Sequence, residues 1–143
     1  MADGPDKPLI SLKSVSQAVR QMRCPENACA VIAVLRGGRV PASLIAHQLG
    51  LPLHTIRVAF RDEENEPVTA SPCLIGRAPD FPDMRGPLLL VDDVSVSGAT
   101  FIEARRHLNT SRIITVVLKG RADIVLMPDL PSGCVQWPWN ETL

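Results

Sequence analysis

Residues 88–100 have the sequence LLLVDDVSVSGAT, in which an apolar run is followed by two adjacent carboxylates and a turn of small residues. The run 88–91 is short and wholly apolar, which predicts a strand buried on both faces of a sheet. A tight polar loop is predicted over 92–98, and a helix from about 99 to 108, with Phe101, Ala104 and Leu108 on its inner face. This strand–loop–helix unit is typical of an α/β fold.

The same alternation of apolar runs and amphipathic segments continues on both sides of this unit. We expect a helix over about 11–22 with Ser11 as its N-cap, and a second helix that holds Pro41 in its first turn and ends at Gly50. Further strands are predicted at 28–35, 54–60, 113–118 and 124–127, with a hairpin strand around 73–75. The sequence therefore predicts a single α/β domain, over 1–143, with a mostly parallel central sheet flanked by helices.

Two segments do not fit this alternation. Residues 61–87 contain five prolines and an acidic cluster at 62–66, which is typical of a long loop that works as a lid. The tail carries Pro128, Pro131 and Pro138, and we expect it to run over the surface. In parallel sheets ligands bind at the carboxyl ends of the strands, so we examine the loops after Leu35, Val91 and Leu118 for function.

Composition excludes several classes of protein. The chain has 143 residues, 45% of them hydrophobic, and equal numbers of acidic and basic side chains, which disfavours a general nucleic-acid binder. Aromatic residues make up only 3%, too few for a platform that stacks single-stranded nucleic acid. The first residues do not resemble a signal peptide, and no apolar run reaches about 18 residues. We therefore expect a cytoplasmic protein with reduced thiols and no membrane partner.

The loop after residue 91 combines groups that suit a phosphorylated sugar. A helix N-terminus carries unpaired amides and a positive dipole end, and Ser97, Gly98 and Thr100 would complete a cup for a phosphate monoester. Asp92 and Asp93 could accept hydrogen bonds from two vicinal hydroxyls, or hold Mg²⁺ through waters. The alternative is a capped helix with two solvated aspartates.

The other two loops are less specific. Residues 34–39, VLRGGR, form a second amide-rich loop between a strand and a helix, with two guanidinium groups that suit an anion. This loop matches neither the Walker A motif nor GxGxxG. Lys119 follows an apolar strand and could donate to a carbonyl oxygen of a bound base, or could simply be an exposed lysine that begins a loop.

Together the three loops resemble those of the type I phosphoribosyltransferases. Residues 88–100 are similar to that family's phosphoribosyl pyrophosphate signature, and residues 34–42 with 49–52 resemble the pyrophosphate loop and helix of bacterial purine salvage enzymes. The tail 134–139, CVQWPW, is similar to the base-covering hood of small xanthine-guanine phosphoribosyltransferases, so the resemblance implies a hood over about 124–143.

The resemblance implies a reaction in which phosphoribosyl pyrophosphate and a nucleobase, most naturally a purine, give a nucleotide and pyrophosphate. It assigns catalysis to Asp92, Asp93 and Arg36, with Mg²⁺ as cofactor at the two carboxylates. It implies three sets of binding residues. Phosphoribosyl pyrophosphate would contact Asp92, Asp93, Ser95, Val96, Ser97, Gly98, Ala99 and Thr100; pyrophosphate would contact Leu35, Arg36, Gly37 and Gly38; the base would contact Lys119, Val135 and Trp137. Family members are usually dimers or tetramers, so a homo-oligomer is expected.

Two residues depart from the family pattern and leave the base open. Val96 stands where 6-oxopurine enzymes carry an aspartate, and Cys134 stands where an aromatic residue stacks on the base unless Trp137 or Trp139 takes its place. The alternative function is a regulatory protein that binds the phosphorylated sugar or a nucleotide without turnover. A phosphoacceptor receiver domain is disfavoured, because its acidic pair would follow the first strand, where this chain has Arg36-Gly37-Gly38.

Overall fold

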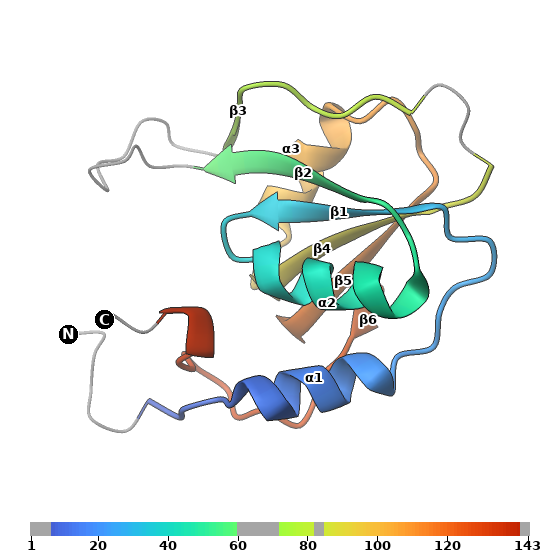
Figure 1. Cartoon of the computed structure of the whole chain (residues 1–143). Helices are drawn as coiled ribbons and strands as arrows, with labels where there is room; N and C mark the ends of the chain where they lie inside the picture. Colours follow the sequence, from blue (N-terminus) through green and yellow to red (C-terminus); the bar gives the residue numbers. More distant parts are fainter. Residues whose placement is uncertain (1–6, 60–71, 82–84, 141–143) are drawn as a thin grey trace.

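A six-stranded sheet forms the centre of the molecule, with the strands in the order β3-β2-β1-β4-β5-β6 (Figure 1). The computed structural model describes residues 7–59, 72–81 and 85–140. Every neighbouring pair of strands is parallel except β2 with β3. The strands are β1 Ala30–Leu35, β2 Leu53–Ala59, β3 Cys73–Ile75, β4 Leu88–Ser95, β5 Ile113–Gly120 and β6 Ile124–Val125; the helices are α1 Leu12–Arg20, α2 Arg39–Leu49, α3 Ala99–Arg106 and the 3₁₀ turn η1 Pro138–Asn140. The predicted mostly parallel α/β fold is confirmed.

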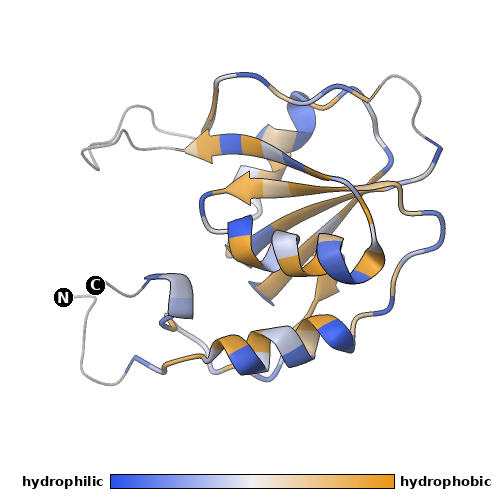
Figure 2. Ribbon diagram, in the orientation of Figure 1, coloured by the Kyte–Doolittle hydropathy of each residue, from blue (hydrophilic) through white to orange (hydrophobic). Residues whose placement is uncertain are grey.

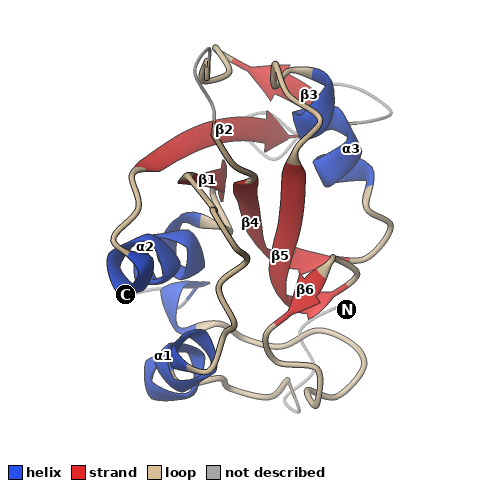
Figure 3. Ribbon diagram, turned by 90° about the vertical axis from the view of Figure 1, so that its right-hand side faces the viewer, coloured by secondary structure: helices blue, strands red, loops and turns tan. Residues whose placement is uncertain are grey.

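The central strands are mostly apolar where helices cover both faces of the sheet (Figure 3). Along β4, Leu88 and Leu90 belong to the cluster under α3, whereas Leu89 and Val91 point to the opposite face and pack with α2. Figure 2 shows the inner strands as almost unbroken apolar bands, while the helices carry polar residues as well. A polar residue in such a strand needs a hydrogen-bond partner, as Thr115 of the strand 113–120 has in Asp123, whose carboxylate accepts from the Thr115 amide at 2.9 Å.

The structure confirms the residues that were predicted to begin the first helix and to end the second. Ser11 is the N-cap of α1, and its hydroxyl accepts a hydrogen bond from the Ser14 amide at 3.1 Å. Gly50 ends α2 in the left-handed conformation, with φ of 66°, which costs glycine little. Phe101, Ala104 and Leu108 are all buried, as expected for the inner face of α3.

Two strands are longer than predicted. β4 continues through Asp92 and Asp93 to Ser95, because this segment pairs with β5, with Asp92 opposite Val117 and Ser95 opposite Gly120. β5 likewise includes Lys119, which is opposite Val94. Both carboxylates are therefore held on a paired strand, and the expected polar loop shortens to the turn before α3.

The tail does not simply run over the surface, which corrects the expectation drawn from its prolines. Val135 and Trp137 are buried in a third cluster, with Val15 of α1 and Leu118 of β5. The segment is fixed by a parallel bridge between Leu9 and Gln136. The Gln136 amide donates to the Pro8 carbonyl at 2.7 Å, and the Ile10 amide donates to the Gln136 carbonyl at 2.9 Å.

Much of the predicted lid lies outside the described residues, and within 72–81 and 85–87 the structure contains β3 as a short hairpin strand. The four cysteines are all free. None of the helices in the described ranges has the length and apolar character needed to cross a lipid bilayer.

Candidate active site

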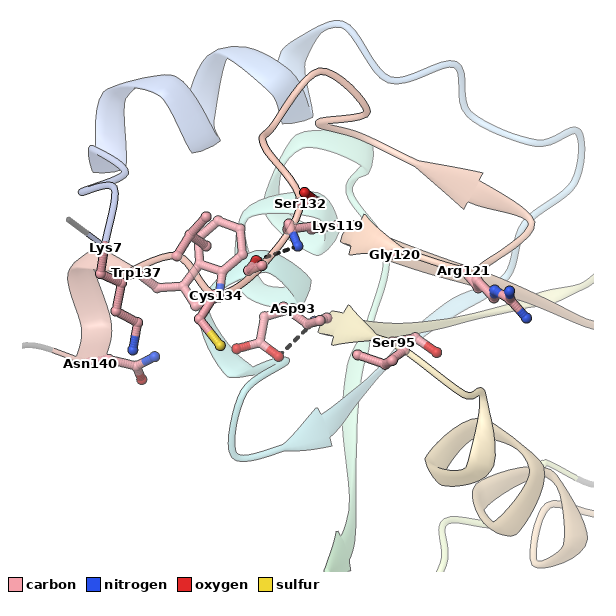
Figure 4. A pocket seen from close by; sticks show the side chains of 14 residues that line it. Lys7, Asp93, Ser95, Lys119, Gly120, Arg121, Ser132, Cys134, Trp137 and Asn140 are labelled. Carbon is pink, nitrogen blue, oxygen red and sulfur yellow. Dashed lines mark hydrogen bonds between the residues drawn. The ribbon is translucent and has the colours of Figure 1, made fainter. Parts of the chain in front are cut away.

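The central cavity, of about 610 Å³, brings together residues from two strand ends and the tail. Asp93, Ser95 and Val96 come from β4 and the turn after it, Lys119 from β5, and Val135 and Trp137 from the tail. Figure 4 shows the Asp93 carboxylate and the Cys134 thiol together between the two strands and the tail. The predicted base-binding residues therefore line the same cavity as one of the predicted catalytic carboxylates.

The turn cavity, of about 220 Å³, lies against the start of α3. It is lined by Asp92 and by the predicted phosphoribosyl-binding residues Ser95, Val96, Ser97, Gly98, Ala99 and Thr100. Gly98 has a φ of 83°, and the Ser97 hydroxyl accepts a hydrogen bond from the Ala99 amide at 3.2 Å. The turn thus exposes a helix N-terminus beside hydroxyl groups, which suits a phosphate monoester.

The arginine cavity, of about 490 Å³, lies at the loop between β1 and α2. It is lined by Arg36 and Gly37 from the predicted pyrophosphate loop, together with Arg39, Val40, Trp139 and Asn140. The other two predicted loop residues do not line it. Leu35 packs on the core under α2, and the Gly38 amide donates to the Val34 carbonyl at 2.8 Å. The Leu35–Arg36 peptide bond is cis.

The three cavities adjoin one another in a fixed order. The turn cavity and the central cavity share Val94, Ser95 and Val96, whereas the central cavity and the arginine cavity share Asn140. One extended molecule could therefore place one end at α3, its middle beside the two carboxylates, and its other end at Arg36.

The paired carboxylates are in contrasting positions. The Asp92 carboxylate accepts from the Asp93 amide at 2.8 Å, and the Asp93 carboxylate accepts from the Val94 amide at 2.8 Å. Burial of Asp92, together with the nearby charge of Asp93, raises the pKa of Asp92 to about 8. This shift favours the protonated form of Asp92 in the ligand-free protein, and a bound cation or hydrogen-bond donor would favour its ionised form.

Gly37 allows the first loop to reach the second carboxylate. A methyl group built at Gly37 would lie 2.5 to 2.7 Å from the Asp93 carboxyl atoms. That separation is well below van der Waals contact, so any side chain here would displace Asp93 or the loop. Gly37 thus has a steric role toward the site.

Replacing Gly37 with Ala is expected to lower kcat/KM at least about tenfold, and to destabilise the fold by about 1–3 kcal/mol, the usual cost of overpacking. Steady-state assays and thermal unfolding measure the two effects. Because the added methyl acts on Asp93, the loss of kcat/KM should be much smaller when Asp93 is already Asn, as in a double-mutant cycle. The loss of stability should stay the same, because Asn has the same shape as Asp. Fully additive losses of kcat/KM would contradict an effect of the loop on this carboxylate.

Lys119 and the tail differ in detail from the expectations. The Lys119 ammonium donates to the Gly133 carbonyl at 2.7 Å, so it is tied to the tail while it lines the central cavity. Trp137 is 2% exposed and stacks on Trp139, with ring centres 5.4 Å apart and nearly parallel planes. Trp137 and the exposed Cys134 both line the central cavity, whereas Trp139 lines the arginine cavity.

Several cavity residues were not predicted. Lys7, Arg121 and Asn140 line the central cavity, and Trp139 and Asn140 line the arginine cavity. Arg39 lies in the loop that the sequence identifies as a candidate anion site, so its charge could have identified it as a residue of this cavity. Lys7 lies far from every motif, and the pairing of the two terminal segments brings it to the site, whereas Asn140 directly follows the predicted hood motif 134–139.

Comparisons with known proteins agree with this geometry. A family model described as a phosphoribosyl transferase domain matches residues 11–136. A purine phosphoribosyltransferase from Pyrococcus horikoshii has a similar structure, with 25% identity, a TM-score of 0.69, and coverage of 96% of this chain and 97% of that one. A xanthine-guanine-hypoxanthine phosphoribosyltransferase from Helicobacter pylori shares the fold, with 14% identity, a TM-score of 0.72, and 93% coverage of both chains.

Proposed function

This chain belongs to the phosphoribosyltransferase family, and on that premise we propose that it transfers the phosphoribosyl group of phosphoribosyl pyrophosphate to a purine base. The observation that carries the proposal is the order of the three cavities. A serine-rich turn, a pair of carboxylates and an arginine-lined loop follow one another. Phosphoribosyl pyrophosphate has its 5′-phosphate, its ribose hydroxyls and its pyrophosphate in that same order.

The substrate would be held by the groups that its parts require. The turn amides with Ser97 and Thr100 bind the 5′-phosphate, and Asp92 and Asp93 accept hydrogen bonds from the ribose hydroxyls. Arg36 and the Gly37 amide contact the pyrophosphate. Lys119 donates to an exocyclic oxygen of the base, and the Val135 backbone contacts the base at its far edge.

The reaction breaks the bond from the anomeric carbon to pyrophosphate and forms a bond to a base nitrogen. Positive charge develops on the sugar while negative charge grows on pyrophosphate, so fixed cations and carboxylates are the main catalytic groups. Val96 is 80% exposed at the rim of the central cavity and has no group that takes up a proton. The proton of the base would therefore pass to another acceptor, such as the departing pyrophosphate, water or the Asp93 carboxylate in the same cavity.

Mg²⁺ fits this site as an ion that arrives with the substrate. Within the described ranges no group of three or more His, Cys, Asp or Glu side chains gathers, but Mg²⁺ is commonly held by one or two carboxylates together with substrate phosphates. Asp92 and Asp93 supply that number of carboxylates. When bound, the ion would neutralise charge on the pyrophosphate, and Asp92 would give up its proton.

We further propose a cytoplasmic, homo-oligomeric enzyme of purine salvage. This rests on the family membership, on the free cysteines, and on the close likeness in length to the Pyrococcus enzyme. Sedimentation of the purified protein would measure the oligomeric state.

The direct test is turnover with a panel of bases. The protein with Mg²⁺ and phosphoribosyl pyrophosphate should release pyrophosphate and form a nucleotide with at least one of guanine, xanthine, hypoxanthine and adenine. Because Lys119 is a donor, we expect the 6-oxopurines to react faster than adenine. Tight binding of phosphoribosyl pyrophosphate without turnover of any base would instead identify a regulatory binding protein.

A further inference from the structure

The ends of the described chain meet at the site. Lys7 and Asn140 both line the central cavity, and both lie outside residues 11–136, the part matched by the family model. Figure 4 shows them at one end of this cavity, with Ser95 and Arg121 at the other. The Ser95 end continues into the turn cavity, so the Lys7–Asn140 end lies away from the proposed 5′-phosphate site.

Both residues are held by defined contacts. Lys7 precedes Pro8, whose carbonyl accepts the Gln136 amide at 2.7 Å. Asn140 ends the turn η1, where its amide donates to the Trp137 carbonyl at 3.1 Å. Trp137 itself is buried under this turn and stacked on Trp139. These hydrogen bonds fix the backbone next to Lys7 and at Asn140.

Asn140 marks the border between two cavities, and the side chains around that border are rich in donors. The arginine cavity contains Arg36 and Arg39, and Lys7 adds an ammonium from the central cavity. Arginine, lysine and the tryptophan N–H donate hydrogen bonds and accept none. Moreover, the Trp139 Nε1 is buried without a hydrogen-bond partner among the described residues. A ligand at this border must therefore supply acceptors, as a multiply charged anion does.

We propose that Lys7 and Asn140 bind the pyrophosphate leaving group, together with Arg36 and Arg39. The inference rests on the proposed function, which places the ribose at Asp93 and leaves the pyrophosphate to extend toward Arg36. Lys7 lines the central cavity, and Asn140 lines both that cavity and the arginine cavity, where the path ends. Lys7 and Asn140 are then specificity residues that the terminal segments add to the family domain.

The test compares Lys7→Gln and Asn140→Asp with Lys13→Gln, which removes an exposed lysine from α1. The KM for phosphoribosyl pyrophosphate, the KM for the base and the inhibition constant of pyrophosphate are measured for each. Loss of a charged hydrogen bond should raise the first and third constants about tenfold in Lys7→Gln. Asn140→Asp should raise them further because it adds a like charge. The KM for the base should stay within about twofold, and Lys13→Gln should match the unchanged protein.

The outcomes separate this inference from the proposed function. If the unchanged protein turns over and both variants keep its pyrophosphate constants, the inference is wrong and the enzyme assignment stands. A change in the KM for the base alone would also overturn it, because the two residues would then contact the base. If the unchanged protein neither turns over nor binds pyrophosphate, both proposals fail. Circular dichroism and melting temperature show that each variant is folded.

Discussion

Replacing Asp93 with Asn should lower kcat/KM at least about 100-fold and should abolish the rise in melting temperature produced by phosphoribosyl pyrophosphate with Mg²⁺. The carboxylate lines the central cavity, where it would accept from ribose hydroxyls, and hydrogen bonds to charged groups contribute about 1.5–3 kcal/mol each. A ligand of the folded state stabilises it by mass action, so weaker binding removes that stabilisation. Steady-state kinetics and thermal unfolding with and without ligand measure both effects.

Asp93→Asn should change the charge of the side chain without disturbing the local structure. An Asn side-chain oxygen can still accept from the Val94 amide, which the Asp93 carboxylate accepts at 2.8 Å, so the local backbone should be preserved. Asp80→Asn is the charge control, because Asp80 is exposed and lies outside all three cavities. An unaltered ligand-induced shift in Asp93→Asn would contradict the whole assignment of the central cavity to the sugar.

Replacing Asp92 with Asn should make the ligand-free protein more stable at pH 8, even though it removes a proposed catalytic group. In the folded protein, burial and the charge of Asp93 raise the pKa of Asp92 to about 8 from its ordinary value of 3.8. The folded state therefore holds a proton that the unfolded chain has lost, and the free energy of unfolding falls as the pH rises between these two values. At pH 8, Asp92→Asn should therefore raise the free energy of unfolding by at least about 1.4 kcal/mol, which is the equivalent of one pKa unit.

Chemical denaturation between pH 4 and pH 9, in the presence of a chelator, measures this effect. The unchanged protein should lose stability with rising pH across that range, and the slope should be much smaller in Asp92→Asn. Asp80→Asn should keep the original slope. A variant that loses stability with pH as steeply as the unchanged protein would show that Asp92 ionises normally in the folded state.

The elements that could be predicted are those whose signals are local. The apolar run of β4, the Ser11 cap and the Gly50 stop each depend on neighbours within a few residues, and the structure confirms them. The end of β4 could not be predicted in this way. Asp92 and Asp93 are polar, which locally favours a loop, but pairing with a strand more than twenty residues away extends β4 to Ser95.

The residues of the candidate site could likewise be predicted only where their signals are local. The loops at the ends of β1 and β4 were predicted because each motif is contiguous, and the structure places them around adjoining cavities. Lys7 carries no local signal, since its position depends on the bridge between Leu9 and Gln136, whereas Asn140 follows the predicted hood motif directly. The buried tail was missed for a related reason: prolines indicate an irregular backbone but do not say what the side chains beside them pack against.

The bridge between Leu9 and Gln136 also sets the order in which the parts of the central cavity can come together during synthesis. On the ribosome, the segment with Lys7 emerges early, whereas Gln136 leaves the exit tunnel only after the strands of the sheet. The nascent chain can therefore pair β4 with β5 before the tail closes the wall of the central cavity. The cavity is complete only when the two segments have met.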